Sequence, residues 1–541
     1  MSNSNLVRGT MVLTGANYIS KFLGMFYLIP FHALVGSTGG ALYSYAYNPY
    51  QIFISLSTLG IPLAMSKFVA KYNALEDYRT KEAMFRSGLI FMTITGIVSF
   101  IIMFFSAEWL AQIFLPDDQY KNSVEDAAFV IKMVSFALLI IPPMSLVRGY
   151  FQGHGSMGPS AISIVCEQVV RIVFLLVGAY VVIQVLDGTI KLAVGLAAFA
   201  AFVGAVASSF VLGGFYKKRR PYIVRDLEKS KTAAPTLTTK EMYRELLAYA
   251  GPFILVGIAT PLYQLIDQMT FNRAMANIGL EEISEDLLSV ILVYGHKIVI
   301  IPVTIATGLS LALLPAMTAA FTSNHREQYN NYINQSLLII MLLILPASVG
   351  LSILGTQAYG TLYSAQDAYQ SAGHIMSYYA PTALFFALFT VSASMLQGIN
   401  KQNFAVISLA VGLIVKLTCN VPFIYFFGGK GAVIATSFAV LIASLINLVK
   451  LYRETYFDMR RLFKRSLLIV ILTTIMAVVV IITKWLIGLP FDEGPSKLKY
   501  ILQLIGGVGI GGYIYLWMAY KTTLLERLFG SRVNRLSKIF F

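Results

Sequence analysis

Long apolar stretches recur along almost the whole chain, and they constrain its fold more than any other feature. A helix that crosses a bilayer needs about 20 mostly apolar residues. The stretches at 41–70 and 287–319 also contain Pro, Gly, Ser and Thr, and such breaks are tolerated where the freed backbone faces protein or a wet cavity. We predict an all-α polytopic membrane protein with about fourteen spans, at 8–35, 41–70, 84–107, 126–151, 158–185, 190–215, 246–272, 287–319, 329–351, 372–398, 403–427, 431–452, 464–487 and 498–522.

The composition excludes the alternatives to a membrane protein. Hydrophobic residues make up 57% of the 541 residues and charged residues only 12%, whereas an ordinary soluble domain is roughly a quarter charged. A disordered chain would need low hydrophobicity and high charge. The two cysteines, Cys166 and Cys419, lie in apolar runs and exclude a disulfide scaffold. The first apolar run is too long for a signal peptide, so we expect it to be the first spanning helix.

The basic residues predict the orientation in the membrane. The chain carries 41 Lys+Arg against 26 Asp+Glu, a net charge of +15. Basic residues gather in the connections at 67–86, 217–244 and 450–465 and in the tail, which lie on one side if the number of spans is even. The connections at 108–118 and 281–286 are acidic or neutral. The positive-inside rule then places both termini in the cytoplasm. We interpret the basic loops as topology signals and contacts to anionic lipid, not as nucleic-acid sites.

A tandem repeat divides the chain. Positions 245 residues apart match: Gly149–Gly153 resembles Ser394–Gly398, and Arg171 corresponds to Lys416. Two repeats of six spans with the same topology, related by an axis along the membrane normal, are typical of transporters that bind substrate near the midplane and work by alternating access. The expected parts are a first lobe (1–216), a basic cytoplasmic linker (217–244), a second lobe (245–455), and two added helices with a cytoplasmic tail (456–541).

Ionisable residues inside the spans are the candidate functional residues, because each costs roughly 2.5–3.5 kcal/mol to insert. Two further cations, Lys67 and Arg148, lie near the cytoplasmic ends of their spans. The residues in mid-span positions are Lys21, Lys132, Glu167, Arg171, Asp267, Lys297 and Lys416.

Several of these charges have a structural alternative. Glu167 and Arg171 are four residues apart and could pair on one helix face. Lys132, Lys67 and Arg148 could extend to the interface, and Asp267 could pair with Arg273.

Three deep lysines have no carboxylate three or four residues away, and we expect them to line a polar central cavity. They are Lys21, Lys297 and Lys416. A cationic cavity favours an anionic substrate, and an ammonium is a strong partner for phosphate. A pyrophosphate-bearing lipid fits, with its tail in a groove shaped by the two added helices.

One segment resembles the signature of the MviN/MurJ-like lipid flippases, closest to their SpoVB/YtgP-type branch in Gram-positive bacteria. It runs from Arg148-Gly149-Tyr150-Phe151-Gln152-Gly153 through Met157, Pro159-Ser160-Ala161 and Glu167-Gln168 to Arg171. The beginning of the chain, with Arg8-Gly9-Thr10 and Ile19 to Gly24, is similar to the family's first helix, and Tyr294 to Lys297 with Pro302 and Leu314-Pro315 to its eighth.

The resemblance implies the multidrug/oligosaccharidyl-lipid/polysaccharide exporter fold, with two six-helix lobes in a V plus two helices, and the flipping of lipid II. It implies cavity arginines in the first, second and eighth helices. Lys21 and Lys297 correspond to two of these. Tyr27 and Leu28 replace a second arginine and its acidic neighbour, and no counterpart lies near Phe53. We expect Arg171 and Lys416 to supply the missing charge.

Other functions remain open at this stage. The chain could flip another undecaprenyl-linked oligosaccharide, of the capsule or teichoic type, or export small molecules by cation coupling. Sugar contacts would then come from Tyr43, Tyr45, Tyr47 and Asn48, which could equally be packing residues. A sodium-type site could form from the oxygen ligands of Asp267, Asn420 and Thr436. An enzyme is disfavoured, because the five histidines are scattered and no nucleophile motif is present.

We expect no cofactor other than a coupling monovalent cation; sodium, protons or the membrane potential could each drive transport. The expected partners are lipid II or a related undecaprenyl-pyrophosphate lipid and the surrounding membrane lipids, with no nucleic acid. The chain should be a monomer in the bacterial cytoplasmic membrane, near the proteins of cell-wall synthesis.

Overall fold

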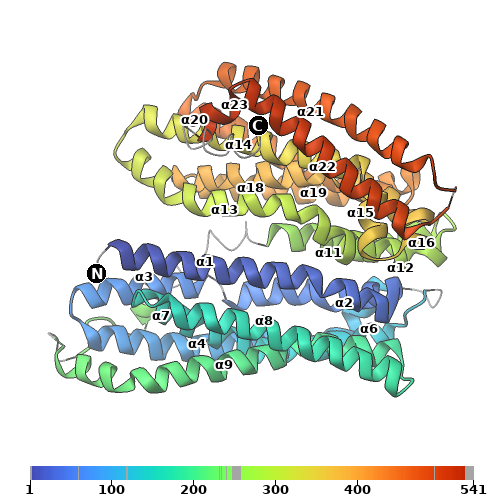
Figure 1. The fold of residues 1–541 in the computed structure, drawn as a ribbon. Coiled ribbons are helices and arrows are strands. Elements are labelled where there is room, and N and C mark those ends of the chain that lie inside the picture. The colour runs from blue at the N-terminus through green and yellow to red at the C-terminus, as the bar shows by residue number, and fades with distance from the viewer. Residues whose placement is uncertain are drawn as a thin grey trace. The chain divides into compact units, whose positions relative to one another are not determined.

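The computed structural model describes residues 3–58, 60–116, 120–230, 232, 234–238, 240–245, 258–492 and 494–529. Throughout these residues the secondary structure is helical, with no strand, which confirms the predicted all-α class. The chain forms two compact units, Met1–Met269 and Thr270–Phe541, divided within the helix Ala259–Ala276 (Figure 1). Part of the predicted span 246–272 and the end of the tail lie outside the described residues.

Eleven helical segments of the described chain are long and apolar enough to cross a membrane, or twelve if the bent pair at the N-terminus is one span. The predicted number of fourteen spans is consistent with this count. Part of the predicted span 246–272 lies outside the described residues, and the predicted span 41–70 is divided between Thr58 and Ile61. The chain is therefore a multi-pass membrane protein.

The first unit is a bundle in which α8 packs on α1 and α9, while α7 packs on α3 and α4. A five-residue π-turn, Val181–Val185, extends α8. The helices are α1 (Asn3–Phe26), α2 (Leu28–Thr58), α3 (Ile61–Ala74), α4 (Tyr78–Phe105), α5 (Ala107–Phe114), α6 (Val124–Ser135), α7 (Ala137–Gly153), α8 (Met157–Tyr180), α9 (Ile190–Glu228) and the first part of α11 (Ala259–Ala276).

The first two spans break at other places than the sequence suggests. The prediction puts a connection between residues 35 and 41, but α2 continues through this stretch with one non-helical residue, Gly36, at φ 66°. The chain bends by 41° between α1 and α2 and turns again at Gly60, also at φ 66°, before α3. Glycine adopts this left-handed backbone without the steric cost that a Cβ brings. Glycine therefore permits the left-handed backbone at residues 36 and 60, and hydropathy cannot locate these positions.

The predicted linker 217–244 is helical in its first part. Helix α9 continues through Pro221 as far as Glu228. The segment that follows is tied to the turn between α3 and α4. The hydroxyls of Thr232 and Thr236 donate hydrogen bonds of 2.7 and 2.9 Å to the Asp77 carboxylate, which also caps α4 at the Thr80 amide. Burial alone would raise the pKa of Asp77, but these hydrogen bonds hold it below its usual value.

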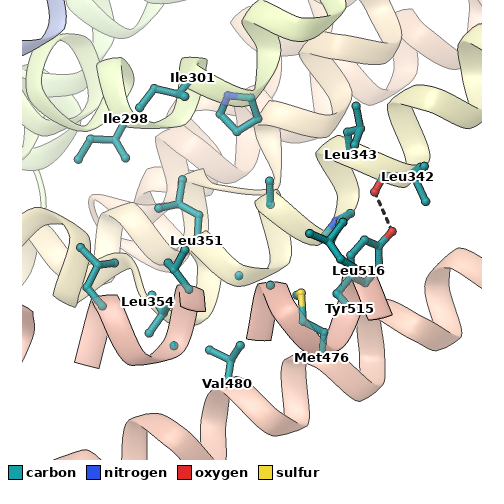
Figure 2. Close-up of a pocket in the computed structure, with 18 residues that line it drawn as sticks. Ile298, Ile301, Leu342, Leu343, Leu351, Leu354, Met476, Val480, Tyr515 and Leu516 are labelled. Carbon is teal, nitrogen blue, oxygen red and sulfur yellow. Dashed lines mark hydrogen bonds between the residues drawn. The ribbon is translucent and has the colours of Figure 1, made fainter. Parts of the chain in front are cut away.

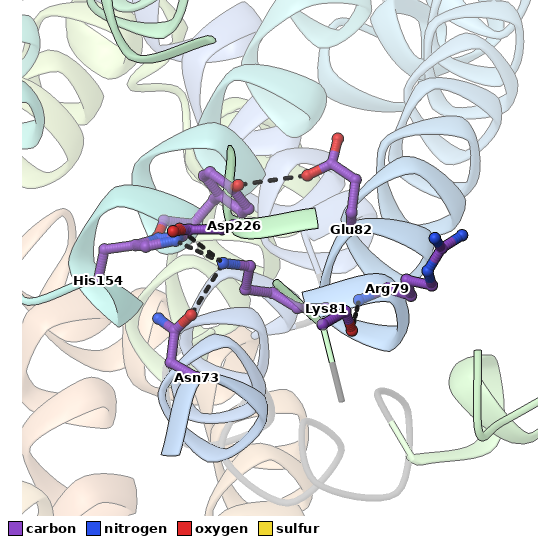
Figure 3. A network of polar contacts seen from close by, with 8 residues as sticks. Asn73, Arg79, Lys81, Glu82, His154 and Asp226 are labelled. Carbon is purple, nitrogen blue, oxygen red and sulfur yellow. Dashed lines mark hydrogen bonds and ion pairs between the residues drawn. The ribbon is translucent and has the colours of Figure 1, made fainter. Parts of the chain in front are cut away.

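A second polar network joins α3, α4, α7 and α9 at the same end of the unit (Figure 3). Lys81 is 1% exposed, and a buried ammonium is tolerated only where it is hydrogen-bonded or paired. Its Nζ donates to Asn73 Oδ1 at 2.8 Å, lies 3.3 Å from His154 Nε2 and 4.0 Å from Asp226 Oδ2. His154 Nδ1 lies 2.9 Å from the carbonyl oxygen of Tyr150. The neutral imidazole satisfies both contacts, with Nδ1 as donor and Nε2 as acceptor.

This network predicts acid sensitivity. Burial, reinforced by the nearby charges of Lys81 and Arg219 and opposed by the contact to Tyr150 and the charge of Asp226, lowers the pKa of His154 to about 4. The unfolded chain, with the usual value near 6.5, binds a proton more readily. The stability that neutral His154 contributes is therefore complete above about pH 6.5 and is lost as the pH falls toward 4. The difference in thermal midpoint between the wild type and His154→Gln should shrink over this range, and parallel pH profiles would contradict the assignment.

The second unit contains the remaining helices. Helix α13 packs on α14 and α18, α20 packs on α18 and α19, and the C-terminal pair α21 and α22 packs on α14 and α15. Two π-turns, Val290–Tyr294 and Ala368–Ala372, lie between consecutive α-helices of this unit. The helices are α12 (Glu281–Ser289), α13 (Gly295–Thr322), α14 (Arg326–Ile353), α15 (Gly355–Leu362), α16 (Ala365–Asp367), α17 (Gly373–Tyr379), α18 (Thr382–Gly398), α19 (Gln402–Phe427), α20 (Lys430–Thr455), α21 (Met459–Gly488), α22 (Lys497–Lys521) and α23 (Leu524–Phe529).

The predicted repeat is present in the backbone. Helices α7 and α18 begin and end at positions 245 residues apart, and α8 and α19 begin at the same offset. The turns that follow α7 and α18 each contain a left-handed residue, Gly155 at φ 70° and Asn400 at φ 60°. A Cβ on Gly149 of α7 would collide with the main chain of Pro62, so α7 and α3 approach closely. The corresponding packing in the second unit is that of α18 on α13.

Candidate functional site

Arg148 is held inside the first unit by a carboxylate and two hydroxyls. Its Nη2 lies 2.6 Å from Glu167 Oε2 of α8 and donates to Ser208 Oγ of α9 at 2.8 Å, while Nε donates to Ser163 Oγ at 2.8 Å. The side chains of Arg148 and Glu167 are 16% and 22% exposed. The predicted pairing of Glu167 with Arg171 on one helix face is thus replaced by a pair that fastens α7 to α8 and α9.

Arg171, one turn after Glu167, lies against tyrosines of α2. Its Nη2 donates to Tyr43 Oη at 3.0 Å, and the guanidinium lies 5.2 Å from the centroid of the Tyr47 ring. The two tyrosine rings stack at 5.2 Å. Arg171 Nε is buried without a hydrogen-bond partner in the described part of the chain. The guanidinium therefore rests on hydroxyl and π contacts and retains one donor for another group.

The tyrosines proposed as sugar contacts are mostly enclosed. Tyr43 is 3% exposed, and Tyr45 is fully buried against Phe114 with stacked rings 5.9 Å apart. Asn48 is 4% exposed, while Tyr47 is half-buried. In this conformation the aromatic side chains of α2 pack inside the unit, and Tyr43 and Tyr47 contact the Arg171 guanidinium.

Lys21 and Lys67 occupy more open positions. Lys21 is exposed on α1, the helix that packs beside α8 with its Glu167 and Arg171. Lys67 is exposed on α3, near the end of the predicted span 41–70. Of the predicted cations of this unit, Lys21 is the accessible one within a helix that the sequence places at membrane depth. Lys132, by contrast, forms an ion pair of 2.7 Å with Glu108.

Lys297 lies at the beginning of α13, directly after the π-turn Val290–Tyr294. Its neighbour His296 is 9% exposed, and Nδ1 of that ring lies 2.7 Å from Tyr379 Oη. Lys297 itself is half-buried. Single π-turns inside α-helices occur frequently at functional sites, and Lys297 lies three residues after this one. Hydropathy shows no signal for such a turn.

Lys416 is fully buried inside the second unit. Its Nζ donates to Asn420 Oδ1 at 2.8 Å, to the Ala432 carbonyl at 2.8 Å and to Thr436 Oγ1 at 2.7 Å. Asn420 and Thr436 were predicted as ligands of a coupling cation, and the structure shows their oxygens bonded to an ammonium. Asp267, the third predicted ligand, is 2% exposed on α11. The described residues contain no cluster of three or more His, Cys, Asp or Glu that could hold a metal.

An apolar groove of about 390 Å³ opens in the second unit (Figure 2). Helices α13, α14, α21 and α22 line it, with Ile298, Leu351 and Val480 among the lining residues. Tyr515 also lines the groove, but its hydroxyl donates a hydrogen bond of 2.7 Å to the Leu342 carbonyl and so offers no free donor to a ligand. Ile298 follows Lys297 directly, so a cationic residue is the sequence neighbour of a residue that lines the groove. Sequence reasoning expected a groove from the added helices but named none of its residues.

Comparison with known proteins identifies the family. A family model described as polysaccharide biosynthesis protein matches residues 6–321, and the MatE model matches residues 252–426. Lipid II flippase MurJ of Bacillus subtilis (strain 168) is 41% identical over 533 residues, 98% of each chain. The chain belongs to the MurJ family. The resemblance of the segment from Arg148 to Arg171 is thereby confirmed.

More distant relatives agree with membership of the MurJ family. Stage V sporulation protein B of the same organism is 24% identical over 77% of each chain. A solved structure of lipid II flippase MurJ in an inward closed conformation has a TM-score of 0.64 at 16% identity, covering 96% of this chain and 99% of that one. An inward-facing multidrug resistance MATE transporter has a TM-score of 0.60 at 15% identity, covering 82% and 99%. The MurJ and MATE proteins are flippases and transporters, not enzymes, and the predicted exporter fold is confirmed.

The Arg148–Glu167 pair generates a stability prediction. Removing one partner of a buried ion pair costs about 3–5 kcal/mol, and we expect a smaller loss here because both side chains are partly exposed. Arg148→Met and Glu167→Met should each lower the thermal midpoint of the purified protein. The double variant should recover much of the loss, because neither charge is left without its partner. Lys132→Met, at the more exposed pair with Glu108, is the control and should change little. Additive losses in the double variant would contradict this account.

Proposed function

We propose that this chain translocates lipid II, the undecaprenyl-pyrophosphate-linked peptidoglycan precursor, across the bacterial cytoplasmic membrane by alternating access. The observation that carries the proposal is the 41% identity to the Bacillus subtilis lipid II flippase over 98% of both chains. Relatedness over the full length means that both units and the C-terminal pair α21–α22 have counterparts in that flippase. The internal repeat supports the mechanism, since two similar lobes can exchange an inward for an outward opening.

The proposed orientation has both termini in the cytoplasm. The turn between α3 and α4 and the C-terminal part of α9, joined by the contact of Lys81 with Asp226, lie at one end of the first unit. Both segments are rich in Lys and Arg, including the run from Lys217 to Arg220 on α9. Basic residues that flank spans remain cytoplasmic. At this end they would also contact anionic lipid head groups.

We assign pyrophosphate binding first to Lys21 and Lys297. Lys21 is exposed on α1, and Lys297 is half-buried on α13, next in sequence to Ile298 of the apolar groove. An ammonium binds phosphate as a compact point charge. Arg171 is the third candidate, because its Nε has no hydrogen-bond partner among the described residues. Arg148 and Lys416 are already bonded within their units, and Lys67 lies near the end of the predicted span 41–70, so these three would support the site or take part in another conformation.

The apolar groove is the candidate site for the isoprenoid tail. Its lining by Ile, Leu, Met and Val side chains of α13, α14, α21 and α22 suits a hydrocarbon chain. A volume of about 390 Å³ holds only part of an undecaprenyl chain, so the remainder would stay in the bilayer. This arrangement gives the two added helices a role that the repeated lobes alone do not supply.

A flippase for another lipid-linked oligosaccharide is the second candidate. The family model that matches residues 6–321 is described as polysaccharide biosynthesis protein. A probable low-salt glycan biosynthesis flippase, Agl15 of Haloferax volcanii, is 19% identical over 40% of this chain and 44% of that one. A phosphate-linked carrier lipid would engage the same cations. We favour lipid II because the higher identity extends over the whole chain. We further propose that the protein acts as a monomer near the proteins of cell-wall synthesis.

The test of function is a lipid II accessibility assay in cells depleted of this protein. Depletion should trap lipid II in the cytoplasmic leaflet, and re-expression of the wild type should return it to the outer leaflet. Lys21→Gln and Lys297→Gln should each reduce flipping at least tenfold at normal membrane abundance. Lys132→Gln, which removes a cation already paired with Glu108, is the matched control and should flip normally. Full activity of both test variants would refute the site, and unchanged lipid II distribution on depletion would refute the function.

The tail groove is tested by filling it. Gly512 lines the groove, and a Cβ at this position meets no atom within 4 Å, so Gly512→Leu adds a side chain without a clash at its Cβ. We expect several-fold slower flipping at unchanged abundance and thermal midpoint. Gly509 lies on the same helix with equally open space but outside the groove lining, which makes Gly509→Leu the matched control. Equal activity of the two variants would exclude the groove as the tail site.

A further inference from the structure

The environment of Lys416 resembles a cation site that a side chain already fills. An ammonium has three N–H donors, and this one meets three acceptors at 2.7–2.8 Å, one each from Asn420, Ala432 and Thr436. Lys416 and Asn420 lie one turn apart on α19, and Ala432 and Thr436 one turn apart on α20. Two packed helices thus form a compact cage of oxygens around one positive charge with no exposure to solvent.

The acceptors are the oxygens that a hard cation prefers. They comprise an amide oxygen, a main-chain carbonyl and a hydroxyl, and all three are neutral. Oxygen ligands, main-chain carbonyls included, suit hard cations generally. The carbonyl of Ala432 lies in the first turn of α20, and the Thr436 hydroxyl also bonds to it at 3.0 Å. The same atoms could therefore ligate an alkali ion if the ammonium were absent.

A further contact fixes the direction of the Asn420 amide. Its Nδ2 donates to Thr270 Oγ1 of α11 at 2.7 Å, which turns Oδ1 toward the ammonium. The cage is therefore pre-arranged by groups outside it. Preorganisation of this kind keeps ligand oxygens in position when the cation changes, because the surrounding hydrogen bonds hold their orientation.

The equivalent position in the first unit lacks this cage. Arg171, 245 residues earlier, contacts the hydroxyl of Tyr43 and the ring face of Tyr47. A planar guanidinium suits such stacking, whereas a compact ammonium suits a small oxygen cage. The repeat thus places a cation at the same point of both units, but the second unit alone surrounds it with the oxygen geometry of an alkali-ion site.

We propose that Lys416 is a built-in cation that permanently occupies a monovalent-cation site between α19 and α20. The second unit then requires no alkali ion at this place, and removal of the ammonium creates a site for Na⁺ or Li⁺. The proposal rests on the side chains of this unit and holds whichever lipid the protein carries. If the proposed flippase function is correct, flipping needs no sodium binding here, and a driving force that requires no ion at this cage, protons or the membrane potential, would power it.

The test measures thermal stability of the purified full-length protein in NaCl, LiCl, KCl or choline chloride at constant ionic strength. A ligand that binds only the folded state raises the midpoint in a saturable manner. The wild type should show the same midpoint in all four salts. Lys416→Asn, which shortens the side chain and adds one oxygen ligand, should show a saturable rise of several degrees in NaCl or LiCl over choline chloride. Thr436→Val in the same background should abolish the rise.

The control is Lys484→Asn in the same unit, because the ammonium of Lys484 donates to a single main-chain carbonyl, that of Ile353, at 3.0 Å. This variant should gain no cation response. A folded Lys416→Asn variant that is insensitive to Na⁺, Li⁺ and K⁺ would overturn the proposal. If Lys416→Asn does not fold, the wild type decides: a saturable Na⁺ response that Thr436→Val removes would mean that the cage binds an external ion. None of these measurements depends on lipid flipping.

Discussion

The high cost of placing charge in a bilayer governs how this chain uses its few ionisable side chains. Four of the buried or half-buried cations in the described part of the chain have several defined partners each. Arg148 has a carboxylate and two serines, Arg171 has two tyrosines, Lys416 has three oxygens, and Lys81 has an asparagine, a histidine and an aspartate. Several of these contacts join helices that are distant in sequence, such as α8 with α2 through Arg171 and α4 with α9 through Lys81. The charges that make the chain difficult to insert therefore also hold its helices together.

The internal repeat shows how one backbone plan acquires two chemistries. Helices α7 and α18 coincide at both ends under a shift of 245 residues, and the cations at 171 and 416 keep the same register. Their surroundings have diverged. The first unit adds the Arg148–Glu167 pair, whereas at the second unit the corresponding positions are Ala393 and Gly412. The two units thus share a backbone topology, whereas the side chains around the corresponding cations differ.

The apolar groove and the lysine beside it combine two demands of an amphipathic substrate. A pyrophosphate needs positive charge, and a long isoprenoid needs a continuous hydrocarbon surface. Helices α21 and α22 pack on α14 and α15 and complete that surface. Lys297 follows the π-turn Val290–Tyr294 and directly precedes Ile298 of the groove lining. The groove therefore arises from packing between distant segments, and this is why the two added helices led us to expect a groove whose residues the sequence could not name.

Sequence alone determined the helical class, the multi-pass character, the repeat and the family, because these depend on local hydropathy and on short motifs such as that from Arg148 to Arg171. It also identified the intramembrane charges. Only the tertiary structure decided their partners: Glu167 pairs with Arg148 instead of Arg171, and Lys416 occupies the cage of oxygens expected for a coupling cation. Partner choice depends on which helices pack together, and spacing along one helix does not contain that information.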